Sequence, residues 1–301
     1  MSDPRIFDRR AVRAHRRRAA SSFADHDFLF REVADRLAER LLDIQRPFTW
    51  VAEIDARGPI LEQALRNAGV FEHRGISRYL RLTDDRSAGP SILADPELLP
   101  LAPQAVDLLV SNLALHWVND LPGLLVQARR ALRPDGMLLA SLLGGQTLHE
   151  LRAVLLEAES EIDGGVSPRV SPFADIRDTG ALLQRAGLAL PVSDVDSIDV
   201  TYQDAFALLR DLRGMGETNA VRDRRRAFSR RAMLMRAAEL YHERHRTADG
   251  RIHATFQVLY LAGWAPHESQ QKPLRPGSAK GRLADALGAV EHSAGEKARP
   301  R

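Results

Sequence analysis

Residues 51–65 read VAEIDARGPILEQAL, which is a short apolar strand, a turn and the start of a helix. Ligands often bind at such strand-to-helix turns in α/β sheets, because the backbone N–H groups at the start of a helix are free. Glycines usually let the backbone approach the ligand there. This turn reads Asp55-Ala56-Arg57-Gly58-Pro59 and keeps only Gly58, while Glu53 stands where an acid would end the strand.

Apolar runs and helical spacing alternate along most of the chain. After the strand at 50–54, the sequence predicts strands at 76–82, 91–94, 106–111 and 137–143, with helices at 60–68 and 121–132 between them. A helix at 23–44 precedes this region. Helices at 147–161, 175–186, 204–212 and 226–245 and strands at 191–202 and 254–264 follow it. This alternation predicts an α/β fold with a doubly wound, Rossmann-like parallel sheet.

Composition excludes several classes of site. The chain has 301 residues, of which 44% are hydrophobic and 28% charged, as in ordinary globular proteins. It has no cysteine, which excludes disulfides, thiolate metal sites and cysteine nucleophiles. No apolar run approaches the roughly 18 residues of a membrane span, and no secretory signal is found. We therefore expect a cytoplasmic location, with peripheral contact at the inner membrane as an option.

Positive charge gathers at the two ends of the chain. Residues 1–18 hold seven arginines against two aspartates, and residues 272–301 hold seven Lys/Arg against three acids. The net charge is only +3, so the middle of the chain is acidic. Basic ends suit nucleic acid, anionic lipid or an acidic partner. Nucleic acid is the weaker option, because no aromatic residues interleave with the basic ones.

Three further strings lead to a family resemblance. They are Ala-Asp-Pro-Glu-Leu-Leu-Pro at 94–100, Val-Asp-Leu-Leu-Val-Ser at 106–111 and Leu-Arg-Pro-Asp-Gly at 132–136. Together with the turn after the first strand, this layout resembles the class I methyltransferases that depend on S-adenosylmethionine, over about residues 48–145. The resemblance implies S-adenosylmethionine as the cofactor.

A closer resemblance extends over nearly the whole chain. It is carried by Ile6 to Arg9, Ser111 to Pro122, Gly144 to Leu148, Ser167-Pro168, Ser171 to Phe173, Gly214 to Glu217, Gly263-Trp264 and His267 to Gln270. These strings resemble the mitochondrial complex I assembly factors of methyltransferase fold and their bacterial relatives, with malonyl-carrier-protein methyltransferases as more distant cousins. The resemblance implies a seven-stranded sheet whose last strand is antiparallel. It also implies a protein substrate, which for the mitochondrial members is an arginine of a complex I subunit that becomes hydroxylated.

The predicted organisation has three parts. Residues 1–47 form an N-terminal helical arm, and its Phe7 and Arg9 resemble a lid over the crevice. Residues 48–269 form the methyltransferase-like domain, with a helical insertion at about 203–250. Residues 270–301 form a basic tail that is expected to be disordered.

The cofactor-binding candidates follow the strand ends. In an ungapped reading, the three glycines of the family's loop fall on Asp55, Arg57 and Pro59. Asp84, with Asp85 as the alternative register, could accept the ribose hydroxyls, and Asp95 the adenine amino group. Each acid could instead be a turn or cap residue. The full set of predicted cofactor residues is Glu53, Asp55, Arg57, Gly58, Asp84, Ala94, Asp95 and Asn112.

Catalytic candidates are fewer. His116 could move a proton and Trp117 could form a pocket wall, but a place in the core explains both as well. Asn112 could meet the methionine end of the ligand or the substrate, and a capping role is its alternative. No metal site is predicted. Three functions stay open: a methyltransferase-fold enzyme that acts on a protein, an assembly factor that modifies or chaperones a complex I subunit, and a pseudoenzyme that no longer binds S-adenosylmethionine because its loop has changed.

Overall fold

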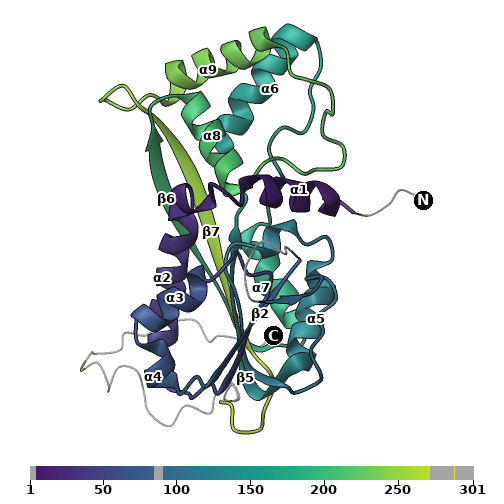
Figure 1. Ribbon diagram of the computed structural model, residues 1–301, viewed down its shortest axis with the longest axis vertical. Helices are drawn as coiled ribbons and strands as arrows, with labels where there is room; N and C mark the ends of the chain where they lie inside the picture. The colour runs from purple at the N-terminus through teal and green to yellow at the C-terminus, as the bar shows by residue number, and fades with distance from the viewer. Residues whose placement is uncertain (1–4, 85–90, 272–287, 289–301) are drawn as a thin grey trace, which may run out of the picture. The chain divides into compact units, whose positions relative to one another are not determined.

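The computed structural model describes residues 5–84, 91–271 and 288 of the chain. Residues 1–267 form one compact unit and residues 268–301 a second. All elements below belong to the first unit (Figure 1). The helices are α1 (Arg9–Ala19), α2 (Phe28–Leu42), α3 (Ile60–Asn67), α4 (Val70–Arg74), α5 (Leu121–Ala131), α6 (His149–Asp163), α7 (Ile176–Arg185), α8 (Ala205–Met215) and α9 (Arg231–His245). The strands are β1 (Trp50–Glu53), β2 (Arg78–Thr83), β3 (Ile92–Leu93), β4 (Val106–Ser111), β5 (Leu132–Leu143), β6 (Ala189–Tyr202) and β7 (Ile252–Trp264).

The seven strands form one sheet in the order β3-β2-β1-β4-β5-β7-β6. The first five are parallel to one another, whereas β7 runs antiparallel to both β5 and β6. The predicted α/β fold, with its antiparallel last strand, is thereby confirmed. The carboxyl ends of β1, β2 and β4 lie at one edge of the sheet, where this fold class binds its ligands.

Helices cover both faces of the sheet (Figure 1). One face packs on α2, α3 and α4 through a large apolar cluster that includes Leu37, Leu61 and Val110. The other face packs on α5 and α7 through a second cluster that includes Leu109, Leu125 and Leu183. The continuous apolar sequence of β4 follows from burial on both sides.

A helical cap stands beyond the ends of the long strands β6 and β7 (Figure 1). It consists of α8 and α9, which the sequence places in the insertion, together with α6, which packs against α9. The sequence predicts the helix at 147–161, which is α6, as part of the sheet domain and not of the insertion. Since α6 pairs with α9, the cap draws on residues from both sides of β6.

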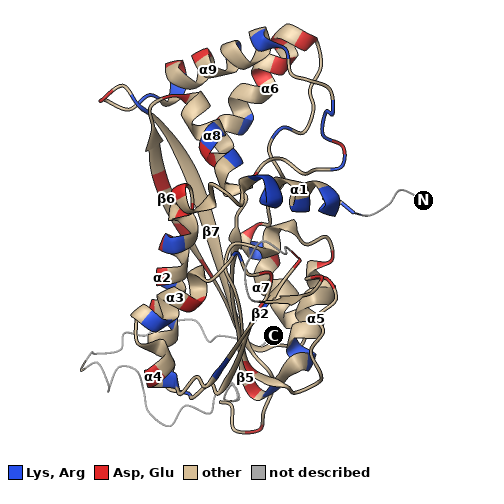
Figure 2. Ribbon diagram, in the orientation of Figure 1, with Lys and Arg blue, Asp and Glu red and all other residues tan. Residues whose placement is uncertain are grey.

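The N-terminal segment is bound to the loop that follows α8. Phe7 forms a bridge with Val221, and the backbone N–H of Asp8 donates to the carbonyl of Ala220 at 2.8 Å. Asp8 then caps α1, whose N–H groups at Arg10 and Ala11 donate to its carboxylate. These contacts hold α1 over the ends of β1 and β2, where Arg16 meets Asp55 and Asp84, and the region between α1 and these strand ends is called the crevice below. The blue residues of Figure 2 show how much positive charge α1 carries.

Some boundaries differ from the sequence reading. Strand β5 begins at Leu132, five residues early, because the Arg133–Gly136 segment continues the strand through a register shift opposite Val106 and Leu108. The helix expected at 23–44 begins at Phe28. Asp85 and nearly all of the predicted tail lie outside the described residues. In the described part, no helix is long and apolar enough to cross a membrane.

Candidate functional site

The turn after β1 keeps the backbone of a ligand-binding loop without its glycines. Asp55 has φ 56° and Gly58 has φ 75°, so both lie in the left-handed region. Aspartate is among the few residues that tolerate this region as a single residue. Asp55 therefore takes the conformation for which glycine is the usual choice, and it places a fully buried carboxylate in the crevice.

An arginine of α1 occupies the crevice beside this carboxylate. Arg16, whose side chain is also fully buried, donates from Nη1 to both oxygens of Asp55 at 2.8 and 2.9 Å and lies 3.4 Å from Asp84. Arg9, about two turns earlier, donates to Asp84 at 2.7 Å and lies 3.8 Å from Asp95. The acids that end β1, β2 and β3 thus meet the same helix.

Burial and charge pull the pKa values of these acids in opposite directions. Burial raises the pKa of Asp55, but the guanidinium of Arg16 outweighs it and the net shift is downward. Burial and the charge of Asp55 hold the pKa of Asp84 above its usual value, although Arg16 and Arg9 oppose them. The same contacts raise the pKa of Arg16 further. Arg16 therefore stays charged and acts as the counter-ion of Asp55.

Arg57 turns away from the crevice. Its Nη2 donates to the carbonyl of Met215 at 2.7 Å, its Nη1 lies 3.2 Å from Glu217, and its guanidinium lies over the ring of Phe23. The prediction of Arg57 as a cofactor-binding residue assumed that its side chain points toward the ligand. Because the side chain is tied to the segment after α8, its positive charge is neutralised there.

Glu217 joins the predicted catalytic candidates. Its Oε2 accepts hydrogen bonds from Trp117 Nε1 at 2.8 Å and contacts His116 Nε2 at 3.0 Å. Burial raises the pKa of Glu217, but His116, Arg57 and Arg16 outweigh it and the net shift is downward. The structure therefore brings His116 and Trp117 together on one buried carboxylate, which leaves Nδ1 of His116 buried and unpartnered.

Three other predicted residues, Asn112, Asp95 and Ala94, do not contact Glu217 through a hydrogen bond or an ion pair. Asn112 is buried and bonds to the Phe30 carbonyl at 2.8 Å and to Ser141, so it links α2, β4 and β5. The Asp95 side chain is half exposed and accepts from the backbone of Glu97. Ala94 is half-buried after β3. Their roles in cofactor binding stay predictions.

Glu53 accepts a hydrogen bond from the Tyr79 hydroxyl at 2.9 Å and is nearly inaccessible to solvent. Burial raises its pKa to about 8, so the folded chain holds a proton that the unfolded chain loses above its ordinary pKa. The free energy of unfolding should therefore fall as pH rises from about 5 to 8, by on the order of 3 kcal/mol from this group.

Urea unfolding at several pH values tests this assignment. In Glu53→Gln we expect the free energy of unfolding to decline less between pH 5 and 8, because glutamine has no proton to lose. The exposed Glu72→Gln serves as the matched control and should keep the slope of the original protein. Equal slopes for Glu53→Gln and the original protein would contradict a protonated Glu53.

Arg16 and Glu217 were not among the predicted site residues. Arg9, Arg13 and Arg16 are spaced four and three residues apart, which places them on one face of a helix. That spacing was the available signal for Arg16. Glu217 stands in the Gly214–Glu217 string that carries the resemblance, but nothing local distinguishes it from a surface acid.

Three buried guanidinium nitrogens in the crevice have no partner. They are Nε and Nη2 of Arg16 and Nε of Arg9. Buried N–H groups of a cation are costly unless an acceptor meets them, and a carboxylate is the natural acceptor. S-adenosylmethionine offers a carboxylate as well as ribose hydroxyls, which a carboxylate such as Asp84 can accept. The donor and acceptor groups of the crevice therefore fit this cofactor.

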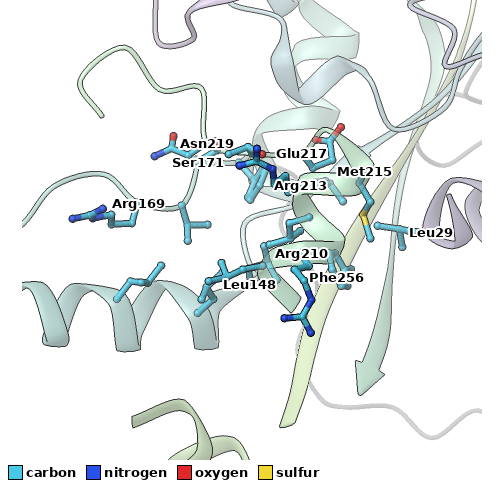
Figure 3. Close-up of a pocket in the computed structure, with 18 of the residues that line it drawn as sticks. Leu29, Leu148, Arg169, Ser171, Arg210, Arg213, Met215, Glu217, Asn219 and Phe256 are labelled. Atoms are coloured by element: carbon cyan, nitrogen blue, oxygen red, sulfur yellow. The ribbon is translucent and has the colours of Figure 1, made fainter. Parts of the chain in front are cut away.

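A cavity of about 420 Å³ adjoins Trp117 and Glu217 on the cap side (Figure 3). Apolar side chains of α6, α8 and β7, together with Leu148 just before α6, line most of it, and Phe256 is the residue from β7. Arg169, Arg210 and Arg213 are the cations of its lining. Among residues 5–84 and 91–271, no three histidine or acidic side chains are grouped so that they could hold a metal ion.

Comparison with known proteins connects this geometry to a family. The pattern of a family described as a methyltransferase domain matches residues 72–140. The arginine-hydroxylase NDUFAF5 of Homo sapiens is 41% identical over 280 residues, which cover 91% of this chain and 81% of that protein. The Danio rerio protein of the same name is 38% identical, covering 93% and 89%. The chain belongs to the NDUFAF5 family.

Two more distant matches are consistent with this family assignment. The malonyl-[acyl-carrier protein] O-methyltransferase of Xylella fastidiosa is 32% identical, over 87% of this chain and 89% of that protein. A crystal structure of a methyltransferase-like protein from Bacillus halodurans superposes with a TM-score of 0.50 at 13% identity, covering 76% and 99%. At that identity the structural match supports the fold alone, and the fold is that of the methyltransferases.

The comparison corrects the expected location. The NDUFAF5 proteins of Danio rerio, Homo sapiens, Mus musculus and Dictyostelium discoideum are named as mitochondrial, which contradicts the cytoplasmic expectation. That expectation followed from the absence of a recognisable signal or span, and such an absence carries no information about the compartment.

Proposed function

We propose that this NDUFAF5-family protein binds S-adenosylmethionine in the crevice between α1 and the ends of β1 and β2. The observation that carries the proposal is the buried pair of Arg16 and Asp84, which offers unpartnered N–H groups beside a carboxylate. Arg16 and Arg9 would hold the carboxylate of the cofactor, and Asp84 its ribose hydroxyls. When bound, the cofactor supplies an activated methyl group on a sulfonium.

The altered turn is compatible with this proposal. Asp55 adopts the left-handed backbone that glycine would take, and its buried carboxylate is paired with Arg16. Arg57 is paired with Glu217 and with the carbonyl of Met215, so the carboxylate of Glu217 balances its positive charge. Pro59 precedes the first residue of α3, where a missing N–H costs nothing.

We further propose that the substrate is an arginine of a protein partner. This step rests on the names of the relatives, which are arginine hydroxylases, and on the sequence-based expectation of a complex I subunit as partner. Three carboxylates line the region, and each already binds a guanidinium of the chain itself: Asp55 and Asp84 bind Arg16, and Glu217 binds Arg57. Such an environment suits a second guanidinium brought by a substrate.

A second candidate function is an assembly scaffold that binds no cofactor. The observation in its favour is the crevice itself, in which Arg9 and Arg16 already pair with the acids. Under this alternative α1 stays docked over the strand ends at all times. The unpartnered buried nitrogens of Arg9 and Arg16 then lower the stability of the fold without binding a ligand. The two functions differ in one measurable property, which is the affinity for S-adenosylmethionine.

Calorimetric titration with S-adenosylmethionine and S-adenosylhomocysteine tests the proposal. We expect saturable binding of both, and a loss of about tenfold in affinity for Asp84→Asn, because an uncharged acceptor forms weaker hydrogen bonds with hydroxyls. The exposed Asp178→Asn in α7 is the matched control and should bind like the original protein. Absence of binding up to millimolar ligand would leave the scaffold function.

A further inference from the structure

The cap cavity has a mostly apolar lining. Leucines of α6 and α8 form its walls together with Phe206, Met215 and Phe256, and a volume of about 420 Å³ falls within the usual range of small-molecule sites. The apolar lining residues include Leu29, Leu143, Leu148, Leu151, Leu155, Leu209 and Leu212. Each methylene group transferred from water into such an interior gains about 0.8 kcal/mol.

The arginines of the lining differ in how their charge is balanced. Arg169 is neutralised by Glu159 at 2.5 Å and also donates to Ser229. Arg210 and Arg213, three residues apart on α8, are exposed, and within residues 5–84 and 91–271 their side chains form no hydrogen bond or ion pair. Figure 3 shows both side chains beside the apolar lining. The cavity therefore combines an apolar interior with two unbalanced positive charges.

A third cation increases the positive charge at this point. Arg18 of α1 donates to the hydroxyl of Thr218, a lining residue, at 3.3 Å. Burial and the nearby charge of Arg213 both lower the pKa of Arg18. Cations that repel one another around an opening attract an anionic group, because bringing one there relieves the repulsion.

Two neutral polar side chains of the lining already have partners. Asn219 donates to the Pro168 carbonyl and accepts from Val221, while the Trp117 indole donates to Glu217. A peptide in the cavity would bury backbone N–H and C=O groups with few partners, which costs free energy for each. An unbranched hydrocarbon chain with one charged end has no such cost.

We propose that the cavity binds an amphipathic anion, whose acyl or alkyl chain enters the apolar interior and whose carboxylate or phosphate head is held by Arg210 and Arg213. Glu217 lies in the lining too, but its carboxylate is paired with Arg57 and contacts His116, whereas the side chains of Arg210 and Arg213 have no such partner among the described residues. This inference concerns a site separate from the cofactor crevice and does not depend on cofactor binding.

Titration of the full chain with decanoate tests the proposal by calorimetry and by tryptophan fluorescence, for which Trp117 is the reporter in the cavity wall. We expect saturable binding, with methyl decanoate about tenfold weaker because it lacks the charge. The double variant Arg210→Gln/Arg213→Gln should lose about tenfold for decanoate and leave methyl decanoate unchanged. Leu209→Trp, which fills the cavity from a half-buried position, should weaken both ligands.

A matched control removes the same charge elsewhere. Arg10→Gln/Arg17→Gln changes two exposed arginines of α1 that do not line the cavity, and it should bind decanoate like the original protein. The proposal is overturned if decanoate does not bind up to millimolar concentration. It is also overturned if methyl decanoate binds equally well, or if the control double variant loses as much affinity as the cavity variant.

The anion could be a free acid or a lipid in a bilayer, and vesicles of phosphatidylglycerol distinguish the two sources. Phe228, 99% exposed in the loop whose Ser229 contacts Arg169, offers an apolar group for insertion into a bilayer. Vesicle binding that falls in Phe228→Ala and competes with decanoate supports a bilayer lipid. Decanoate binding without vesicle binding supports a free acid.

Discussion

Arg16→Met should destabilise the protein by about 3–5 kcal/mol, the usual cost of removing one partner from a buried ion pair. The reason is that Asp55 and Asp84 would remain buried without their shared counter-ion. Arg17→Met, at the neighbouring exposed position, should change stability by less than about 0.5 kcal/mol. Urea unfolding at neutral pH measures both values.

The pH dependence of the same variant has a defined sign. In the original protein, the lowered pKa of Asp55 stabilises the fold above the ordinary carboxyl pKa and loses this effect as pH falls through the lowered value. In Arg16→Met the folded carboxylates would bind protons more tightly than the unfolded ones. Its stability should therefore rise as pH is lowered from about 7 to 5. If Arg16→Met lowers the free energy of unfolding by less than about 1 kcal/mol, and stability does not rise at lower pH, α1 does not dock in the crevice.

The sheet could be predicted because its signals are local. The apolar run at Val106 to Ser111 and the Asp84 that follows β2 can be recognised within a few residues of sequence. The antiparallel last strand was expected only from the family resemblance, and the strand order was not predicted, since pairing between distant strands leaves no local signal in the sequence. An N-terminal helical arm was predicted, but the bounds of α1 were not, because its buried face carries Arg16 between Val12 and Ala19, where an apolar residue would signal a helix.

The centre of the site depends on contacts between distant segments. Arg16 is 39 residues from Asp55 and 68 from Asp84, and Arg57 is 160 residues from Glu217. Sequence alone placed Arg57 in the crevice because the turn around it belongs there. Only the fold shows that Glu217 draws the side chain away, and that the positive charge in the crevice comes from α1 instead.

The central claim is that Arg16 and Arg9 hold the carboxylate of S-adenosylmethionine. Decarboxylated S-adenosylmethionine keeps the adenosine and the sulfonium and lacks only that group. We expect the original protein to bind it about a hundredfold more weakly than the complete cofactor, which corresponds to roughly 2.7 kcal/mol. In Arg16→Gln the difference between the two ligands should shrink to about tenfold or less, because one of the two cationic partners is gone.

Arg9→Gln offers the same comparison should Arg16→Gln prove too unstable for titration, because Arg9 is partly exposed and its loss disturbs the fold less. The decisive measurement is the calorimetric titration of the original protein with these two ligands. Tight binding of the cofactor together with a large loss for the decarboxylated form is the result that the account predicts. Equal affinity for both ligands, or no binding of either, would contradict it.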